Sequence, residues 1–481
     1  MAVAICCNSN YFSSQFLSGG PSLSSSSSSC SSSGLLSPSL PLHNSIRSRS
    51  SSSRTRRRRS GIAVMEAGGD AILNSKRNWG WGSFQCPLPM SSSVVKASTN
   101  SALGVSDVDS KTDDVSTLKL PPLPDKQVLV GVGVVGLDFL ASVASYPDPD
   151  AKIRTLDALA QGGGNVGNAL TAAARLGLRP RIFSKLANDS AGIGICKELE
   201  SNGVDASHIV VAEEGVSPFT YIIVDKEAKT RTCIHTPGHP PFEPQDLSPS
   251  AISSFLNGAD LLYLDGRLPE ATLLVAEEAR RRRLPIIVDA ERKREKMDEI
   301  LTFADYLVCS AKFPQVWTEA PTLAEALIGL AVLLPRLRFI IVTQGSQGCV
   351  MLERSTSEAD DILDPNATLL LLRNEAEQVH NSEPTVFSSK VGAFQGSSSN
   401  GAVVGRLLVG TAATLQPEEV VDTTGAGDAF IGGITYGILA GFPPEQMLCL
   451  GATVAAAKCK ALGARTGLPL RSDPSLIPWL Q

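Results

Sequence analysis

Residues 421–430, which read Val-Asp-Thr-Thr-Gly-Ala-Gly-Asp-Ala-Phe, decide how the rest of the chain is interpreted. Gly425, Ala426 and Gly427 have little or no side chain, so the backbone can turn tightly and present its amides at the start of the apolar, helix-like run 429–439. Amides placed in this way bind phosphate. Asp428 follows in the first turn, where its carboxylate can accept the proton of a hydroxyl that attacks phosphorus. The stretch predicts phosphoryl transfer, with Asp428 as the base and residues 425–427 as the anion hole. The alternative is a helix start with a capping Asp and no function.

The segment 422–430 resembles the C-terminal signature of the ribokinase-like (pfkB) sugar and nucleoside kinases. This resemblance implies an α/β fold, a ribokinase-like three-layer sandwich with a central, mostly parallel sheet and a small β lid. It also implies a transfer of the γ-phosphoryl group of ATP, with Mg²⁺, to a hydroxymethyl group of a sugar or nucleoside-like acceptor. Thr423 corresponds to an ATP contact, and Asp422 and Thr424 match positions that in some members help to hold a monovalent cation such as K⁺.

A second stretch, which begins Gly163-Gly164-Asn165-Val-Gly-Asn168 and continues to Gly177, resembles the N-terminal signature of the same family. Two glycines let backbone amides approach a hydroxyl-rich ligand, and the Asn168 amide both donates and accepts hydrogen bonds. Taken alone, the stretch could be a Gly-rich helix cap. Asp138 matches the carboxylate that binds sugar hydroxyls in the family. The predicted acceptor-binding residues are therefore Asp138, Gly163, Gly164 and Asn168.

The loop Thr343-Gln-Gly345-Ser-Gln-Gly348 directly follows the strand-like run 339–342 and resembles the nucleotide loop of the family. Ligands of open α/β sheets bind at the carboxyl ends of the strands, where this loop would lie. The same residues could also form an ordinary β-turn. With Thr423, the resemblance predicts that Thr343, Gly345 and Gly348 contact ATP.

One segment departs from the family. Many relatives have Asn-x-x-Glu after the strand that here ends near residue 309, but this chain reads Ser310-Ala-Lys312-Phe313. The Glu that organises Mg²⁺ and its waters is therefore absent. The ion would depend more on the triphosphate itself, or Lys312 would supply charge in its place.

Two other classes of function remain open. Gly131-Val-Gly133-Val-Val-Gly136 fits the dinucleotide pattern, although no second strand ends in an acidic residue at the expected spacing, so a nicotinamide-dependent dehydrogenase is one alternative. The other is a catalytically weak or inactive kinase-fold protein that acts as an interaction partner in a plastid complex, since some fructokinase-like relatives serve in organellar transcription complexes. The altered segment 310–313 favours this second alternative, whereas the intact Gly-Ala-Gly-Asp favours an enzyme.

Composition favours small-molecule chemistry. The 481 residues are 43% apolar and have a net charge of −5, which gives no reason to expect direct nucleic-acid binding. No apolar run reaches the roughly 18 residues needed to span a bilayer. The ten cysteines include no Cys-x-x-Cys pair, so they are interpreted as free thiols in a reducing compartment.

The first 65 residues contain no Asp or Glu, are rich in serine between residues 22 and 53, and end in an arginine cluster at residues 54–59. Such a leader predicts an organelle transit peptide, and its Met-Ala start and serine content favour a chloroplast, with the stroma as destination, over a mitochondrion. A basic arm that binds nucleic acid is the alternative. Residues 66–124 are expected to be a disordered linker.

The kinase domain is expected from residue 125 to residue 475. Strand-like runs at 128–135, 261–264, 285–288, 306–309 and 339–342 alternate with helix-like runs at 271–283 and 323–334, which predicts a parallel sheet flanked by helices. Short strand candidates within 206–236 predict the lid, which in the resembled family often forms a homodimer contact. Residues 353–401 are acidic and rich in Ser and Asn, and we expect a low-complexity insertion on a surface loop.

Overall fold

The computed structural model describes residues 120–359, 361–379, 381–396 and 401–481. The expected transit peptide and nearly all of the expected linker lie outside these residues. None of the helices in the described part combines the length and the hydropathy needed to span a membrane.

Parallel strands form the centre of the larger sheet, as the alternation of apolar runs predicted. Almost all of their residues are buried, which is typical of strands covered by helices on both faces. In spatial order the strands are β4 (Arg179–Phe183), β1 (Val128–Val132), β9 (Leu261–Leu264), β10 (Ile286–Ala290), β11 (Tyr306–Ser310) and β12 (Phe339–Thr343). The apolar run after β1 is not one strand, because the chain turns at Gly133 and enters β2 at Gly136. The structure therefore contradicts the dinucleotide-binding interpretation, which needs a helix at this point.

Antiparallel strands extend the sheet beyond β12. β13 (Cys349–Arg354) pairs with β12 and with β17 (Ala402–Gly410), and the far edge of β17 pairs with β15 (Val386–Ser388) and β16 (Gly392–Gln395). The short strand β14 (Ile362–Leu363) pairs with β16.

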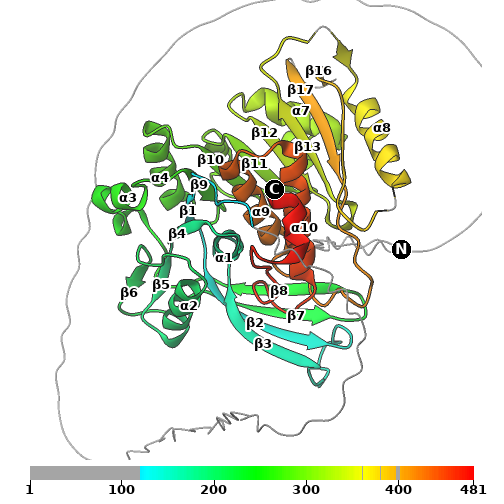
Figure 1. Cartoon of the computed structure of the whole chain (residues 1–481). Helices are drawn as coiled ribbons and strands as arrows, with labels where there is room; N and C mark the ends of the chain where they lie inside the picture. The colour runs from blue at the N-terminus through cyan, green and yellow to red at the C-terminus, as the bar shows by residue number, and fades with distance from the viewer. Residues whose placement is uncertain (1–119, 360, 380, 397–400) are drawn as a thin grey trace, which may run out of the picture. The chain divides into compact units, whose positions relative to one another are not determined.

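The segment expected to be a surface loop also contains a helix, α8 (Pro365–Gln378). Asp364 accepts a hydrogen bond from the amide of Ala367 at 2.6 Å and so caps this helix. Leu369 and Leu372 are buried in the same hydrophobic cluster as Leu407 of β17. The interpretation of this stretch as a loop was therefore wrong, since apolar side chains attach the helix to the edge of the sheet (Figure 1).

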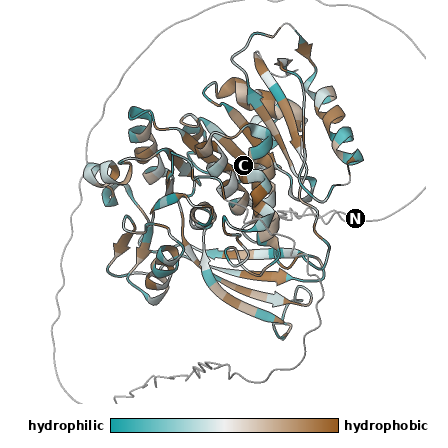
Figure 2. Cartoon of the chain, viewed as in Figure 1, coloured by the Kyte–Doolittle hydropathy of each residue, from teal (hydrophilic) through white to brown (hydrophobic). Residues whose placement is uncertain are grey.

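Helices cover both faces of the sheet, so alternate residues of each strand enter two separate hydrophobic clusters. One cluster includes residues of α1 (Asn165–Arg175), α9 (Ala426–Ala440), α10 (Pro444–Cys459) and α11 (Ile477–Leu480). The other includes residues of α3 (Pro249–Phe255), α4 (Pro269–Arg281), α5 (Met297–Leu301), α6 (Phe313–Thr318), α7 (Leu323–Leu333) and α8. Figure 2 shows hydrophobic colour along the central strands that these layers enclose. The result is a three-layer α/β sandwich.

A second sheet of four strands lies below the sandwich in the view of Figure 1. Its order is β3 (Asp157–Gly163), β2 (Gly136–Val143), β7 (Phe219–Asp225) and β8 (Thr230–Thr236). The prediction placed the lid within residues 206–236, which includes β7 and β8 but misses β2 and β3. The strand β6 (Val210–Ala212), also within that range, pairs with β5 (Lys185–Ala187) and not with the lid. Helix α2 (Ser190–Ser201) contacts β2, β3 and β5.

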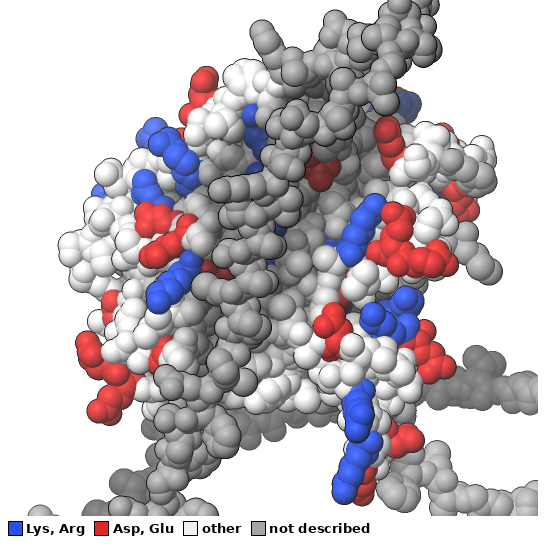
Figure 3. Space-filling view, turned by 60° about the horizontal axis from the view of Figure 1, so that its bottom comes forward, with Lys and Arg blue, Asp and Glu red and all other residues white. Residues whose placement is uncertain are grey.

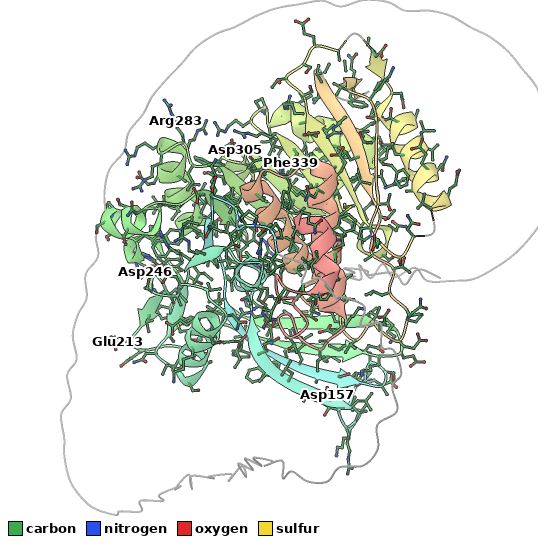
Figure 4. All side chains as sticks on the ribbon, in the orientation of Figure 1. Asp157, Glu213, Asp246, Arg283, Asp305 and Phe339 are labelled. Atoms are coloured by element: carbon green, nitrogen blue, oxygen red, sulfur yellow. The ribbon has the colours of Figure 1, made fainter. Side chains whose placement is uncertain are left out.

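The carboxyl ends of the parallel strands point toward the lid. Asp305, just before β11, and Phe339, the first residue of β12, mark the amino ends of their strands. In Figure 4 the label of Asp157 marks the lid sheet, and Asp305 and Phe339 lie on the opposite side of the large sheet, away from the lid. The loops after β1, β9, β10, β11 and β12 therefore lie at the edge of the large sheet that faces the lid, which is where ligands of open α/β sheets bind.

Candidate active site

Asp428 and the predicted anion hole lie at the start of α9. Gly425 is the residue before the helix and has a φ of 75°, and a Cβ there would lie 2.6 Å from the Cβ of Ala464, so only glycine fits. The amide of Ala426 donates to the carbonyl of Thr423 at 3.2 Å. Within the described residues the amides of Gly425 and Gly427 have no such backbone partner, so they are the donors available to an anion. The Ala426 amide already has a backbone partner, so the anion hole of residues 425–427 stays a prediction.

The structure brings Asn168 and Asp428, 260 positions apart in the chain, into direct contact. The Asn168 Nδ2 donates to Asp428 Oδ2 at 2.8 Å. Burial raises the pKa of Asp428 to about 6, although the Asn168 hydrogen bond and the charge of Arg267 act against this shift. A carboxylate that is ionised near neutral pH and keeps a moderate affinity for a proton suits a general base.

Arg465 fixes the orientation of Asn168. Its side chain is 1% exposed, and its Nε donates to Asn168 Oδ1 at 3.0 Å, so the Asn168 Nδ2 must face Asp428. The Arg465 guanidinium also donates to the carbonyl of Gly163 at 3.1 Å and to Glu198 Oε1 at 3.1 Å. Glu198 Oε2 in turn accepts from the amide of Gly162 at 2.7 Å. These contacts form one network that connects α2, β3, α1 and α9.

Asp138 of β2 lies against the same network. It is 7% exposed, and burial raises its pKa to about 6, against the charge of Arg465 and a hydrogen bond from Thr220 on the neighbouring strand β7. A Cβ at Gly163 would lie 2.1 Å from the Asp138 carboxylate, so this position must be glycine for Asp138 to lie there. Gly164 immediately precedes α1, which carries Asn168. The predicted acceptor-binding residues thus lie together.

The sequence did not single out the charged residues that follow β9 and β10. Arg267 Nη2 and Arg294 Nη2 each lie 2.8 Å from Glu291 Oε2. Burial opposes ionisation of Glu291, but the arginines nearby hold its pKa below the usual range. Burial raises the pKa of Asp289 to about 8, and the charges of Asp428 and Glu291 act in the same direction. This charged group lies beside the base.

Asn165 and Asp265 complete this edge. Asn165 Nδ2 lies 3.4 Å from Asp289 Oδ2, so α1 contacts both Asp289 and, through Asn168, Asp428. Asp265 accepts from the amides of Val134 and Arg267, each at 3.0 Å. Asn165 lies in the motif of residues 163–168 but was not among the predicted acceptor-binding residues. Acidic and basic residues directly after predicted strands were the signal that could have revealed the others.

The lid contributes side chains from β8. Arg231 Nη1 donates to Thr423 Oγ1 at 2.8 Å, and Thr220 Oγ1 lies 3.2 Å from His235 Nδ1. Burial and the charges of Arg267, Arg294 and Arg292 lower the pKa of His235. One face of β8 therefore lies over the site. On the side of the molecule in Figure 3, lysine and arginine alternate with acidic residues without a large field of one sign.

The predicted nucleotide loop lies at the same edge of the sheet. Thr343 ends β12, and its Oγ1 lies 3.4 Å from the carbonyl of Cys309. Gly345 and Gly348 have positive φ values of 64° and 78° and form a tight turn, in which the Gln344 amide donates to the Gly348 carbonyl at 2.8 Å. The loop has the position expected of an ATP contact. Its role stays a prediction.

The region of the missing Asn-x-x-Glu has a different structure. Ser310 Oγ donates to the carbonyl of Glu291 at 2.5 Å, Phe313 is buried, and Lys312 is exposed. Within the described ranges, no group of three or more His, Cys, Asp or Glu side chains could hold a metal ion. A site of this kind suits Mg²⁺ that arrives on phosphates and needs one or two carboxylates from the protein. Asp289 and Glu291 are the carboxylates beside Asp428.

A family model for pfkB family carbohydrate kinases matches residues 138–362 and 398–471 of this chain. Mouse ketohexokinase is 24% identical over 349 residues, which cover 71% of this chain and 98% of that protein. Mouse ribokinase is 23% identical over 353 residues, which cover 72% of this chain and 93% of that protein.

Solved structures show the same fold. Thermotoga maritima ribokinase covers 74% of this chain and 99% of its own, with a TM-score of 0.54 and 20% identity. Arabidopsis thaliana ribokinase, solved with ribose and ATP, covers the same shares of the two chains, with a TM-score of 0.53 and 18% identity.

The fold and the site define a ribokinase-like α/β phosphotransferase. Since the family model matches more than half of its length, the chain belongs to the pfkB family of carbohydrate kinases. It is a kinase that acts on a sugar or a nucleoside. The family model does not match residues 363–397, which contain α8, β15 and β16.

Proposed function

We propose that the protein transfers the γ-phosphoryl group of ATP to a hydroxymethyl group of a sugar or nucleoside-like acceptor. The observation that carries this proposal is the 2.8 Å hydrogen bond between Asn168 and Asp428, directly beside the amides of Gly425 and Gly427, which have no backbone acceptor among the described residues. Base, acceptor ligand and anion donors thereby share one site. Two ribokinases of this fold have been solved with nucleotides: that of Arabidopsis thaliana with ATP, and that of Cryptococcus neoformans with ADP. Both support the choice of ATP as the phosphoryl donor.

Each group has a defined task. Asp138 and the Asn168 amide bind acceptor hydroxyls and orient the reacting one toward Asp428. Above about pH 6 the Asp428 carboxylate is ionised and accepts the hydroxyl proton as the oxygen attacks phosphorus. The amides of Gly425 and Gly427 donate to the phosphoryl oxygens, where negative charge is concentrated. Mg²⁺, when bound, neutralises charge on the phosphates, and Asp289 and Glu291 are the residues that would hold it.

The test is an assay of ATP consumption against a panel of sugars and nucleosides. We expect acceptor-dependent turnover with at least one compound, and its loss in Asp428→Asn. Arg283→Met, a change at an exposed position just after α4, is the matched control and should keep full activity. If the unmutated protein binds ATP but consumes none with any acceptor, the enzyme proposal is refuted.

We also propose that the protein works in the plastid stroma. The support is the acid-free, Ser- and Arg-rich leader at residues 1–65. A fluorescent protein fused behind these residues should enter chloroplasts in plant cells, and the same fusion without them should stay in the cytosol. Nuclear accumulation of the full fusion would instead favour a basic arm that binds nucleic acid.

A homodimer through the lid is a further part of the proposal. Phe139, Tyr221 and Ile234 lie in one row across β2, β7 and β8, and are 37%, 52% and 53% exposed. The Phe139 and Tyr221 rings stack at 5.5 Å, and together these side chains form an apolar surface of the kind that associates. Light scattering should give twice the chain mass. Tyr221→Arg should give monomers, whereas Val211→Arg, at an equally exposed position of β6, should not.

A further inference from the structure

The oxygens of Asp422 are all in use inside the protein. Its Oδ1 accepts from the amide of Thr424 at 2.9 Å and from the Thr424 hydroxyl at 2.7 Å. Its Oδ2 accepts from the amide of Gly463 at 2.9 Å. Its carbonyl accepts from Lys458 Nζ at 2.7 Å. The two residues that the resemblance assigned to a monovalent cation are therefore bonded to each other and to a lysine.

Lys458 is a buried cation at this place. Its side chain is 0% exposed and that of Asp422 is 1% exposed, and Lys458 Nζ lies 4.0 Å from Asp422 Oδ2. Lys458 stands in the last turn of α10, where the helix dipole favours positive charge. Burial lowers the pKa of Lys458, and the charge of Asp422 opposes this shift. One ammonium group thus faces both a carbonyl and the carboxylate of the same residue.

A potassium ion does not fit beside this pair. K⁺ in proteins is held by carbonyl and carboxylate oxygens. Lys458 Nζ already bonds to the Asp422 carbonyl and lies 4.0 Å from Oδ2, while Thr424 and Gly463 donate to the two carboxylate oxygens. The buried charges balance as they stand, with one carboxylate and one ammonium. A second cation would add an uncompensated buried charge, which is strongly unfavourable.

We propose that the Lys458 ammonium group takes the place of the monovalent cation, so that this kinase needs no K⁺. The amides of Val421 and Asp422 donate to the carbonyl of Cys459, the residue after Lys458, at 2.9 and 3.3 Å. The end of α10 therefore holds the segment of residues 421–424 that leads into Gly425 and the anion hole. Lys458 is a positioning residue, since it acts on the phosphate-binding amides through Asp422.

The test compares thermal unfolding in KCl and in tetramethylammonium chloride at equal ionic strength. The unmutated protein should unfold at the same temperature in both salts. Lys458→Ala removes the ammonium group and leaves space beside Asp422. In tetramethylammonium chloride its unfolding temperature should be lower than that of the unmutated protein, and in KCl it should be higher than in tetramethylammonium chloride by at least about 2 °C. Lys458→Met removes the charge but fills the space, so it should be destabilised without recovery.

A matched control is Lys460→Met, two positions along the chain. Lys460 is 50% exposed and contacts Glu419 at 2.9 Å on the surface, so its loss should create no response to K⁺. If Lys458 had only a structural role, Lys458→Ala would lower the unfolding temperature by the same amount in both salts. That result would contradict the proposal.

Crystals of the unmutated protein soaked in Tl⁺ give a second measurement, which stands even if the Lys458 variants fail to fold. No anomalous peak should appear at the Asp422 carbonyl. A peak there, or a K⁺-specific rise in the unfolding temperature of the unmutated protein, would overturn the proposal.

The role in phosphate binding rests on the proposed function, but neither measurement needs an acceptor or turnover. An inactive protein with a K⁺-insensitive fold would refute the kinase proposal alone. An active protein that binds Tl⁺ beside Asp422 would refute the lysine proposal alone.

Discussion

The two sides of Asp428 differ in how completely their polar groups are paired. On the acceptor side, Asn168, Arg465 and Glu198 form a closed network of hydrogen bonds. On the side of β9 and β10, burial holds the pKa of Asp289 at about 8, and among the described residues the buried Nε atoms of Arg267 and Arg294 have no hydrogen-bond partner. Buried polar groups are usually satisfied. The acceptor side is thus built before any ligand binds, whereas the charged side is arranged for a ligand that completes it.

The largest expected effect comes from the residue that both sides share. Asp428→Asn removes the base but keeps the shape and the hydrogen-bonding capacity of the side chain. We expect kcat to fall about 10²–10⁴-fold, the range of general-base catalysis, with nucleotide affinity nearly unchanged. Steady-state kinetics and calorimetric titration with ATP measure the two quantities. A loss of nucleotide binding equal to the loss of rate would mean that Asp428 acts in binding and not as a base.

The next prediction breaks the closed network on the acceptor side. Arg465→Met leaves the buried Asn168 Oδ1 and the carbonyl of Gly163 without their donor, and Glu198 without its ion pair. We expect a loss of about 3 kcal/mol in the free energy of unfolding, and a raised KM for the acceptor because Asn168 can then flip. Urea unfolding and acceptor kinetics check both. Arg283→Met on the exposed surface should change neither, and an Arg465→Met variant of normal stability would contradict the network.

The charged side predicts a dependence of stability on pH. The folded-state pKa of Asp289 is raised to about 8 from its ordinary value of 3.8, so between these values the folded state binds more protons than the unfolded state. Stability from this group is therefore fully present below about pH 4 and is lost as the pH rises toward 8, by up to about 1.4 kcal/mol per pH unit. Asp289→Asn should flatten the slope.

Urea unfolding of the protein without nucleotide at pH 5, 6, 7 and 8 measures this slope. Asp298→Asn, an exposed acidic position on α5, serves as the control and should leave it unchanged. Equal slopes in the unmutated protein and in Asp289→Asn would show that Asp289 is already ionised at neutral pH.

The smallest effect is expected from Ser310, which stands at the position of the missing family Asn. Its hydroxyl donates to the carbonyl of Glu291, so Ser310→Ala should cost about 1 kcal/mol of stability. Because Glu291 keeps both arginines, the rate should change little. Ser355→Ala, at a turn beyond β13, is a control of similar chemistry. A large loss of rate in Ser310→Ala but not in Ser355→Ala would show that the Ser310 hydrogen bond, and not only the two arginines, holds Glu291 in its active position.

The residues that sequence predicted best lie in short motifs whose chemistry is local. Asp428 stands within the turn and helix start that present the amides, and Gly163 and Asn168 share one strand-to-helix turn, so spacing alone brought them together. The contact between Asn168 and Asp428 could not be predicted from the sequence, because these residues are 260 positions apart. Arg465 was not among the predicted site residues. Its place beneath Asn168 depends on how the end of the chain folds back over α1.

The fold was predictable where apolar runs were continuous, as in β9, and was missed where helix signals lay inside polar sequence. Asp364 followed by Pro365 is a good helix start, and it precedes Leu369 and Leu372 at helical spacing. The acidic and Ser-rich sequence around this helix start favoured a loop, so the helix was not predicted. The predicted lid left out β2 and β3, because these strands lie more than 50 residues before β7 in the sequence. Only the tertiary pairing of β2 with β7 makes them part of the lid sheet.

The hydrogen bond from Arg231 to Thr423 links two parts of the site. Arg231 belongs to β8 of the lid sheet, and Thr423 lies two residues before Gly425. Any movement of β8 away from residues 421–424 would have to break this bond, so it would also free the segment that leads into the start of α9.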